Sequence, residues 1–245
     1  MLSAPPHPAL RGRVASIDVV EMDGGASVVL PSTSVVLGFQ FRGRVRTNND
    51  TLELAGVTGI QATAKTYEYE AETGSLLVRF TPVGAACLGV PVAELTGRSV
   101  ALDAILPRVR VAQAHEELAE ASDAATRVAV VERLLSELPF EDDLLITRAT
   151  ALLAASHDEA SVSAVAVALG VSERQLERRF LARVGVTPKR FATLRRFERA
   201  VARARTAPSL TTAALDAGYY DQSHFIRDFR RFAGSSPREH FDRSG

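Results

Sequence analysis

The hydrophobic pattern of the chain changes its period near residue 110. Between residues 14 and 80, short apolar or alternating runs are separated by turn-forming residues, which is typical of β-strands. The candidate strands are 27–30, 34–41, 51–54, 66–71 and 75–80, and the turns between them are expected at 23–25, 31–32, 48–50 and 73–74. Several short strands at this spacing predict a small β-barrel or sandwich.

From 112 to 138 the pattern becomes helical. Apolar residues recur three or four positions apart, at Leu118, Ala121, Ala125, Val128, Val131, Leu135 and Leu138. We predict one helix that Pro139 ends. Its apolar stripe has two interpretations: it packs on its own chain, or it forms the seam of a homodimer. The acidic residues 141–143 then precede a further predicted helix, 144–155, whose N-terminus attracts negative charge.

One stretch near the C-terminus is written twice, at 161–170 and at 209–218. Each copy begins with a serine, Ser161 or Ser209, whose oxygen is a suitable helix cap. Each has an alanine four residues before a glycine, which leaves room for a close helix crossing. Gly170 and Gly218 allow the positive φ that ends a helix and turns the chain. The pattern predicts a helix-turn-helix unit, made twice.

The second helix of each unit is capped by Ser172 or Asp221 and is rich in arginine. Apolar i,i+4 pairs, Leu176 with Phe180 and Phe225 with Phe229, mark the sides that pack inward. Each unit ends in Gly-x-(Thr/Ser)-Pro, at 185–188 and 234–237, and a proline fits the first turn of a following helix. A long linking helix is expected from Pro188 to about Arg205.

The order of these motifs, together with the segment 218–229, resembles the AraC/XylS family of bacterial transcription regulators. The resemblance covers about 141–241. It implies a seven-helix domain with two recognition helices, joined by a long helix and placed in successive major grooves of DNA. The segment 80–103 is similar to the cupin-like sensor half of many such regulators.

The resemblance and the patterns together predict an α+β chain with three parts. These are a cupin-like β-rich sensor domain at 1–110, a helical linker that is also the candidate dimerisation helix at 111–140, and an AraC-type DNA-binding domain at 141–245.

The charge distribution agrees with a nucleic-acid partner for the C-terminal half. The whole chain is neutral, with 29 basic and 29 acidic residues. Residues 156–245 hold 16 Lys and Arg against 10 Asp and Glu, a net charge of +6, so residues 1–155 carry −6. Such asymmetry favours a polyanion partner for the basic part. All but one of those 16 cations are arginine, which suits bidentate contacts to phosphate and guanine.

A helix in the major groove reads bases from the face opposite its buried pair. The candidate base-reading residues are Arg174, Gln175, Glu177 and Arg178 in the first unit, and Gln222, Ser223, Ile226 and Arg227 in the second. Glu177 has an alternative role as an ion-pair partner that orients Arg174 or Arg178. The candidate phosphate contacts are Arg179, Arg183, Lys189, Arg190, Arg230 and Arg231, for which a solvated surface is the alternative.

Other chemistry has little support in the sequence. Cys87 is the only cysteine and lies in an apolar run, so neither an internal disulfide nor a cysteine-based zinc site is expected. The N-terminal half offers only His7 and His115, far apart, so no metal or cofactor is expected. No catalytic spacing or phosphate-binding loop stands out. No signal-like segment or apolar run long enough to span a membrane is present, which indicates a cytoplasmic protein.

The sequence thus predicts a sequence-specific regulator that binds double-stranded promoter DNA and is not an enzyme. Its N-terminal half is expected to sense a small-molecule effector or to mediate homodimer contacts, and an activator would also contact RNA polymerase. The alternative is a DNA-binding domain attached to an enzymatic or architectural module.

Overall fold

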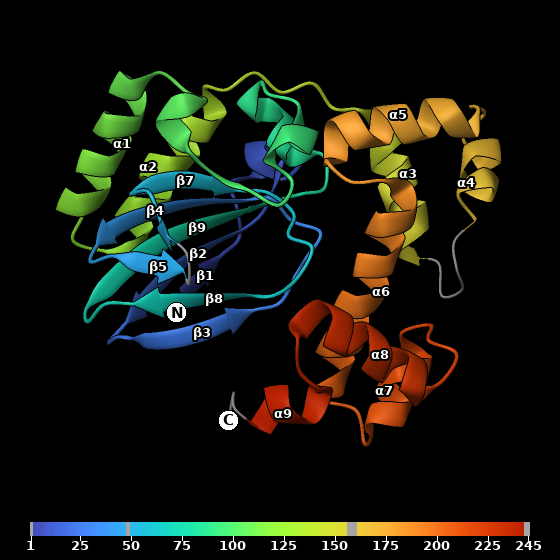
Figure 1. Ribbon diagram of the computed structural model, residues 1–245. Helices are drawn as coiled ribbons and strands as arrows, with labels where there is room; N and C mark the ends of the chain where they lie inside the picture. Colours follow the sequence, from blue (N-terminus) through green and yellow to red (C-terminus); the bar gives the residue numbers. More distant parts are fainter. Residues whose placement is uncertain (1, 48–49, 156–160, 243–245) are drawn as a thin grey trace.

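The computed structural model describes residues 2–47, 50–155 and 161–242. The N-terminal part contains two antiparallel sheets that face each other (Figure 1). The larger sheet has the order β1 (Leu2–Ala4), β2 (Val14–Met22), β9 (Thr73–Phe80), β4 (Val36–Arg42), β7 (Ala55–Thr58), β10 (Ser99–Ala101). The smaller has the order β3 (Gly25–Val29), β8 (Lys65–Tyr69), β5 (Val45–Thr47), β6 (Asp50–Thr51). Among the described residues four short 3₁₀ helices accompany them: η1 (Pro8–Leu10), η2 (Gly84–Leu88), η3 (Val92–Leu95) and η4 (Leu102–Ala104).

Four of the predicted strands correspond to β3, β4, β8 and β9, but the strand expected at 51–54 was wrong in part. Pairing stops at Thr51, and the next strand begins at Ala55. The Gln40 side chain donates to the carbonyl oxygens of Leu52 and Glu53, at 3.3 and 2.7 Å. A side chain thus takes acceptors that a neighbouring strand would otherwise use, so this segment is a loop. Asn48 and Asn49 of the expected turn lie outside the described residues.

Strand β2 was absent from the candidate strands, although it pairs along most of its length with β9. A register shift between Val14 and Ser16 interrupts its alternation, and Asp18 is buried. A bulge and a buried carboxylate both obscure the simple apolar–polar period that a strand normally shows.

The single helix predicted at 112–138 was wrong: two helices, α1 (Arg108–Glu120) and α2 (Ala124–Ser136), occupy this region. Asp123 is extended at ψ 162° and its carboxylate accepts the Thr126 N–H at 2.9 Å. Aspartate in this geometry caps a new helix, so the chain breaks and restarts here. The apolar stripe packs on its own chain, α1 against β4 and α2 against β2 (Figure 1).

The C-terminal part is helical, as predicted, and gives the chain its α+β class. Among the described residues from 144 onward there are seven helices. They are α3 (Leu144–Ala155), α4 (Val162–Ala168), α5 (Glu173–Val184), α6 (Pro188–Ala204), α7 (Leu210–Asp216), α8 (Gln222–Ala233) and α9 (Pro237–Asp242).

Helix α6 connects the two helix-turn-helix units, α4–α5 and α7–α8 (Figure 1). Near its start Phe191 meets Phe180 of α5 edge-on, with ring centroids 5.4 Å apart. Further along, Phe197 packs on Phe229 and Phe232 of α8 at 5.5 and 4.7 Å. Both units are therefore held to one continuous helix by buried aromatic contacts, which fixes their relative placement.

Candidate nucleic-acid interface and barrel cavity

The turns of both units have the predicted geometry. Ser161 and Ser209 accept the N–H of the third residue after them and so cap α4 and α7. Gly170 and Gly218 have φ of +68° and +87°, in the left-handed region that glycine tolerates best. The chain can therefore turn from each first helix into the recognition helix that follows.

Recognition helix α5 begins with a reciprocal capping box. Ser172 Oγ accepts the Gln175 N–H at 3.2 Å, and Gln175 Oε1 accepts the Ser172 N–H at 3.0 Å. The Gln175 amide is thus partly engaged in holding the start of the helix. Leu176 and Phe180 are fully buried on the inner side of α5.

The outer face of α5 carries Arg174, Glu177 and Arg178, and all three side chains are exposed. None of them forms an ion pair within 4.0 Å in the part of the chain that the structure describes. The alternative role of Glu177, as an ion-pair partner of either arginine, is therefore not seen in this arrangement. Two cations and one anion therefore lie on one helix face, and none of them has an ion-pair partner among the described residues.

The second recognition helix, α8, repeats this plan. Asp221 caps it by accepting the His224 N–H at 2.7 Å, and Phe225 and Phe229 are fully buried. Ser223 and Arg227 are exposed, and Ile226 is half-buried. Gln222 Oε1 accepts a hydrogen bond from the Thr211 hydroxyl at 2.8 Å, so this side chain is tied to α7.

Two of the candidate phosphate contacts, Arg179 and Arg183, instead face a buried carboxylate. Their Nε atoms lie 2.7 and 3.6 Å from Asp143 Oδ2. The other oxygen of Asp143 accepts the Ile146 N–H at 3.1 Å, in the first turn of α3. These arginines tie the recognition helix to the start of α3, so their charge is largely compensated within the chain.

Arg190 and Arg231 surround the Phe232 ring, at 4.9 and 4.6 Å from its centroid. Arg190 also donates to the carbonyl oxygen of Ala62, in the loop between β7 and β8, at 2.9 Å. Partial burial lowers the pKa of Arg190 below its usual value. Arg231 pairs with Asp228 at 3.0 Å.

Lys189 and Arg230 differ from these four arginines. Both are exposed, and neither has an ion pair among residues 2–47, 50–155 and 161–242. Of the six candidate phosphate contacts, these two present uncompensated charge.

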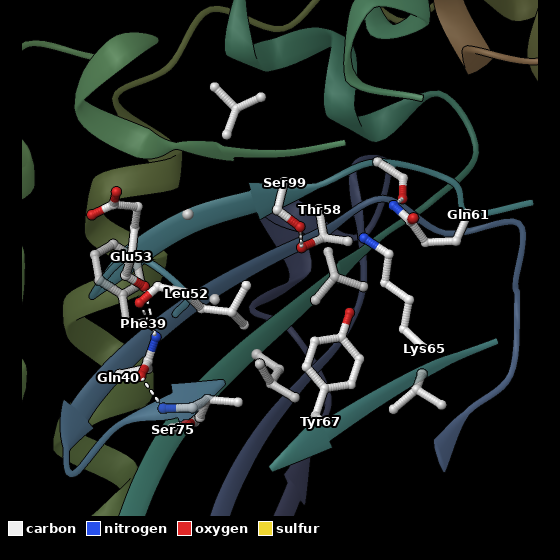
Figure 2. A pocket seen from close by; sticks show the side chains of 18 of the residues that line it. Phe39, Gln40, Leu52, Glu53, Thr58, Gln61, Lys65, Tyr67, Ser75 and Ser99 are labelled. Carbon is white, nitrogen blue, oxygen red and sulfur yellow. Dashed lines mark hydrogen bonds between the residues drawn. The ribbon is translucent and has the colours of Figure 1, made fainter. Parts of the chain in front are cut away.

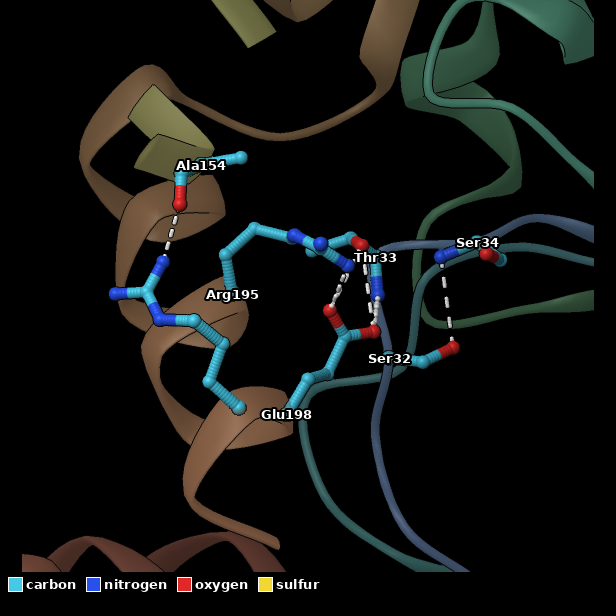
Figure 3. Close-up of polar contacts among 7 residues, drawn as sticks. Ser32, Thr33, Ser34, Ala154, Arg195 and Glu198 are labelled. Atoms are coloured by element: carbon cyan, nitrogen blue, oxygen red, sulfur yellow. Dashed lines mark hydrogen bonds and ion pairs between the residues drawn. The ribbon is translucent and has the colours of Figure 1, made fainter. Parts of the chain in front are cut away.

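Several hydrogen bonds join the barrel formed by the two facing sheets to the helical part, and none of them was predicted. Glu198 of α6 accepts from the backbone N–H of Thr33 at 2.8 Å and from its hydroxyl, while Arg195 donates to the same carboxylate at 2.7 Å (Figure 3). The Ala64 N–H donates to the Phe232 carbonyl oxygen at 2.6 Å. The Thr96 hydroxyl donates to the Gly185 carbonyl oxygen at 2.7 Å. Thr33 and Glu198 are 165 positions apart, and no local pattern marks such a pair.

A cavity of about 260 Å³ lies between the two sheets (Figure 2). Its apolar lining includes Val29, Leu52 and Leu77, and polar side chains at Lys65, Tyr67 and Ser75 also border it. Burial raises the pKa of Tyr67 above its usual value. The cavity thus combines an apolar body with a few hydrogen-bonding groups, as small-molecule sites commonly do.

The cavity wall includes the segments that touch the helical part. Leu30, Pro31, Ser32 and Ser34 line the cavity and flank Thr33. Gly59, Gln61 and Lys65 line it as well and flank the loop at 62–64. A change inside the cavity therefore needs to pass through only a few residues and one hydrogen bond to reach Glu198 on α6 or Phe232 on α8.

The described part of the chain contains no candidate metal site, and its cysteine is not a reactive thiol. Residues 2–47, 50–155 and 161–242 contain no group of three or more His, Cys, Asp or Glu side chains placed to hold a metal ion. Cys87 is buried, which raises its pKa to about 11 and keeps the thiol protonated. Within the same ranges no helix is long and apolar enough to cross a membrane.

Comparisons with known proteins agree with this geometry. Residues 165–243 match the family model described as a helix-turn-helix domain, and this domain is of the AraC type. No curated protein matches the chain.

Solved structures of ToxT from Vibrio cholerae share the fold of most of the chain. One at 1.65 Å resolution has a TM-score of 0.50 and 11% identity, and the match covers 92% of this chain and 97% of that one. A ToxT structure with bound (E)-4-(8-methylnaphthalen-1-yl)but-3-enoic acid has a TM-score of 0.51 and 12% identity, with the same coverage. A third, with an unsaturated fatty acid bound, has a TM-score of 0.50 and 10% identity, and covers 91% of this chain and 93% of ToxT.

Proposed function

We infer that the chain, with its AraC-type helix-turn-helix domain, is a DNA-binding transcription regulator whose N-terminal β-rich region is its regulatory domain. One observation carries this conclusion. Two capped recognition helices are held on a single linking helix, and each has a buried apolar side and an exposed polar side. Such a pair presents two separate sets of hydrogen-bonding groups, which sequence-specific binding requires and non-specific packaging does not.

We assign base reading to the exposed faces of the two recognition helices. Arg174 and Arg178 of α5 and Arg227 of α8 have the geometry to bind guanine O6 and N7, and Glu177 can accept from a cytosine amino group. Ser223 and Ile226 complete the second face, with Ile226 suited to a thymine methyl group. Gln175 and Gln222 keep their amide NH₂ groups as donors, because among the described residues only the carbonyl oxygen of each is used.

The linking helix sets the spacing of the two faces. Helix α6 has 17 residues, which corresponds to a length of about 25 Å. With the recognition helices packed near its two ends, this length suits successive major grooves, roughly 34 Å apart. Lys189 and Arg230 supply phosphate contacts in this arrangement. Arg179, Arg183, Arg190 and Arg231 do so only if their present partners release them.

The regulatory signal in this proposal is a small molecule in the barrel cavity. ToxT, which shares the fold, has been solved with an unsaturated fatty acid and with a naphthyl-butenoic acid bound. In this chain the cavity wall at 30–34 is tied to α6 through Thr33 and Glu198. A ligand that changes the position of this wall would alter the helix that spaces the recognition helices, and thereby DNA affinity.

Two partners expected from the sequence stay predictions. A homodimer would need a surface other than the apolar stripe predicted as its seam, because that stripe packs on its own chain. Contact with RNA polymerase follows only if the protein is an activator. A cytoplasmic location belongs to the same proposal, because the DNA of a bacterial cell lies there.

The experiment is selection of binding sites from random duplexes with the full chain, followed by gel shifts at two salt concentrations. We expect a defined sequence that binds much more tightly than unselected DNA at both concentrations. Equal affinity for selected and unselected DNA would support the architectural alternative and overturn sequence-specific regulation.

A further inference from the structure

Three polar groups that border the cavity are not used by any other part of the described chain: the Lys65 ammonium, the Tyr67 hydroxyl and the Ser75 hydroxyl. We propose that the cavity binds an organic acid with a second hydrogen-bonding group, with its carboxylate at Lys65 and its second polar group at Ser75. This inference rests on the proposed function, because it names the class of effector. It also separates this chain from a receptor for plain fatty acids.

The lysine end of the cavity is rich in donors. Lys65 begins β8 and is half-buried, and within the described chain its ammonium has neither an ion pair nor a hydrogen bond. In Figure 2 its side chain extends toward Thr58 and Gln61. An ammonium that has lost part of its hydration without gaining a partner is unfavourable. A carboxylate, which can only accept, is the ligand group that corrects this.

A hydroxyl pair adds a further donor at the same end. Thr58 Oγ1 and Ser99 Oγ lie 3.1 Å apart, and either can donate to the other. One hydrogen serves this bond, so the second hydroxyl keeps its own hydrogen for a ligand oxygen. Every second residue of a strand points to the same face, so residues 65, 67 and 69 share one face of β8. Burial raises the pKa of Tyr67, so its phenol also stays protonated and able to donate at neutral pH.

The other end of the cavity lacks a partner for a buried hydroxyl. Ser75 is 5% exposed, and its Oγ has no hydrogen-bond partner among residues 2–47, 50–155 and 161–242. In Figure 2 it lies on the side of the cavity away from Lys65, beside Gln40. Gln40 does not pair with it: its amide nitrogen donates to Glu53 O at 2.7 Å and its Oε1 accepts the Val45 N–H at 2.8 Å.

The buried Ser75 hydroxyl decides between two kinds of acid. Buried polar atoms are nearly always hydrogen-bonded, and an unmade bond is costly. The methyl end of a fatty acid would leave Ser75 Oγ unsatisfied, whereas a hydroxyl at the far end of the acid would satisfy it. The apolar residues between the two ends suit a hydrocarbon body. A volume of about 260 Å³ is just below the usual range of about 300–1,000 Å³ for drug-sized ligands, so the acid is small.

The test uses the full chain and three matched series of probes, measured by isothermal titration calorimetry. The first series runs from 6-hydroxyhexanoate to 10-hydroxydecanoate, the second contains the fatty acids of the same lengths, and the third the corresponding terminal diols. At the best length we expect the hydroxy acid to bind at least about tenfold more tightly than the fatty acid, which is the ratio that one satisfied buried hydrogen bond provides. It should also bind at least about tenfold more tightly than the diol, which has no charge to pair with Lys65.

Two variants test which residue binds each end of the acid. Lys65→Met should weaken the hydroxy acid and the fatty acid alike and leave the diol unchanged. Ser75→Ala should abolish the preference of the hydroxy acid over the fatty acid. Arg46→Met, which removes an exposed cation from β5 of the same sheet and does not line the cavity, is the control and should change none of these affinities.

The results that overturn the proposal can be read on the wild-type chain alone. Equal binding of the fatty acid and the hydroxy acid would mean that a water, and not a ligand group, satisfies Ser75. Binding of the diol as tight as that of the hydroxy acid would show that Lys65 does not bind a carboxylate. No binding in any of the three series would show that the ligand is not an organic acid of this kind. Gel shifts on the same preparation separate these outcomes from a failure of the regulator assignment, because specific DNA binding can persist in each of them.

Discussion

The backbone N–H of Thr33 donates to Glu198 Oε1 at 2.8 Å, and this bond joins the wall of the barrel cavity to the helix that spaces the two recognition helices. Thr33 is buried, and its hydroxyl donates to the same carboxylate. Arg195, one turn away on α6, completes the group (Figure 3). A charged acceptor thus holds the loop from a rigid element, and in the proposed function this contact is one route by which a cavity ligand would alter DNA affinity.

Breaking this contact should weaken the coupling between the two parts of the chain. We expect Glu198→Ala to lower the free energy of unfolding by about 1–2 kcal/mol, because a charge-assisted hydrogen bond to a buried donor is lost. It should also speed hydrogen exchange at residues 31–34. A double-mutant cycle with Thr33→Val, measured by urea unfolding, should give a coupling energy of at least about 0.5 kcal/mol. Strict additivity would show that the two residues are not energetically linked.

Removal of one arginine proposed to read bases should relax sequence preference. Arg178→Ala and Arg227→Ala are each expected to lose about 1–3 kcal/mol of binding free energy on the selected site, and much less on unselected DNA. Gel shifts on both duplexes measure the difference. Arg203→Ala, which removes an exposed cation from α6, is the matched control. An equal loss on both duplexes would mark the residue as a phosphate contact.

The Asp143 carboxylate should contribute more to the free energy of unfolding than the carboxylate of the adjacent Asp142. Its side chain is 2% exposed and holds Arg179 and Arg183 of the recognition helix. We expect Asp143→Ala to lower the free energy of unfolding by about 2 kcal/mol, since two arginines and the Ile146 N–H lose their acceptor. Asp142→Ala, whose exposed carboxylate accepts only from Thr147 in the described chain, should cost under about 1 kcal/mol. Urea denaturation of both variants provides the comparison.

Acid should destabilise the C-terminal unit through His240. This side chain packs on Phe229 and Phe241, and burial, followed by the nearby Arg205, lowers its pKa. The folded state therefore favours the neutral ring. At a pH above the ordinary value of 6.5, the ring is neutral in both states and no penalty arises. As the pH falls below that value, the unfolded state takes up the proton first and stability is lost.

The histidine effect is measured as a difference between two proteins. The unfolding free energy of the wild type minus that of His240→Phe should be lower at pH 5.5 than at pH 7.5, because phenylalanine keeps the aromatic contacts and cannot take up a proton. A difference that does not change with pH would mean that other groups cause any acid sensitivity.

The Cys87 thiol should be unreactive while the protein is folded. Because its pKa is raised to about 11, almost no thiolate exists at neutral pH, and the side chain is buried. We expect 5,5′-dithiobis(2-nitrobenzoic acid) to label the native protein very slowly at pH 7.5 and to label one thiol rapidly in urea. Fast labelling without urea would reveal opening of this segment.

The sequence alone was sufficient for the features that depend on neighbours in the chain. Ser161, Ser172, Ser209 and Asp221 cap their helices as predicted. The i,i+4 pairs are buried, since helix geometry places residues four apart on one face. The break at Asp123 was also readable, because an aspartate three residues before Thr126 is a cap signal, but the long apolar stripe obscured it.

Prediction was weaker where the partner is distant. Gln40 satisfies the loop at 52–53 from another strand, so the propensity of that segment did not decide its structure. The residues proposed to read bases could be selected from the helical period. Which of the six candidate phosphate contacts would instead pair within the chain could not be predicted. Arg179 and Arg183 face Asp143, 36 and 40 positions earlier, and Arg190 meets a loop of the barrel.

The sequence by itself determined the duplicated helix-turn-helix units, their caps, their buried pairs and the basic character of the C-terminal half. These follow from short-range hydrogen bonding and from the fixed period of a helix. Only the tertiary structure decided the cavity, its unsatisfied Ser75 hydroxyl and the bond from Thr33 to Glu198. The physical reason is that a charge or hydroxyl has the same local signature whether it meets solvent, DNA or a distant part of its own chain, and only the packing of the whole chain selects among these partners.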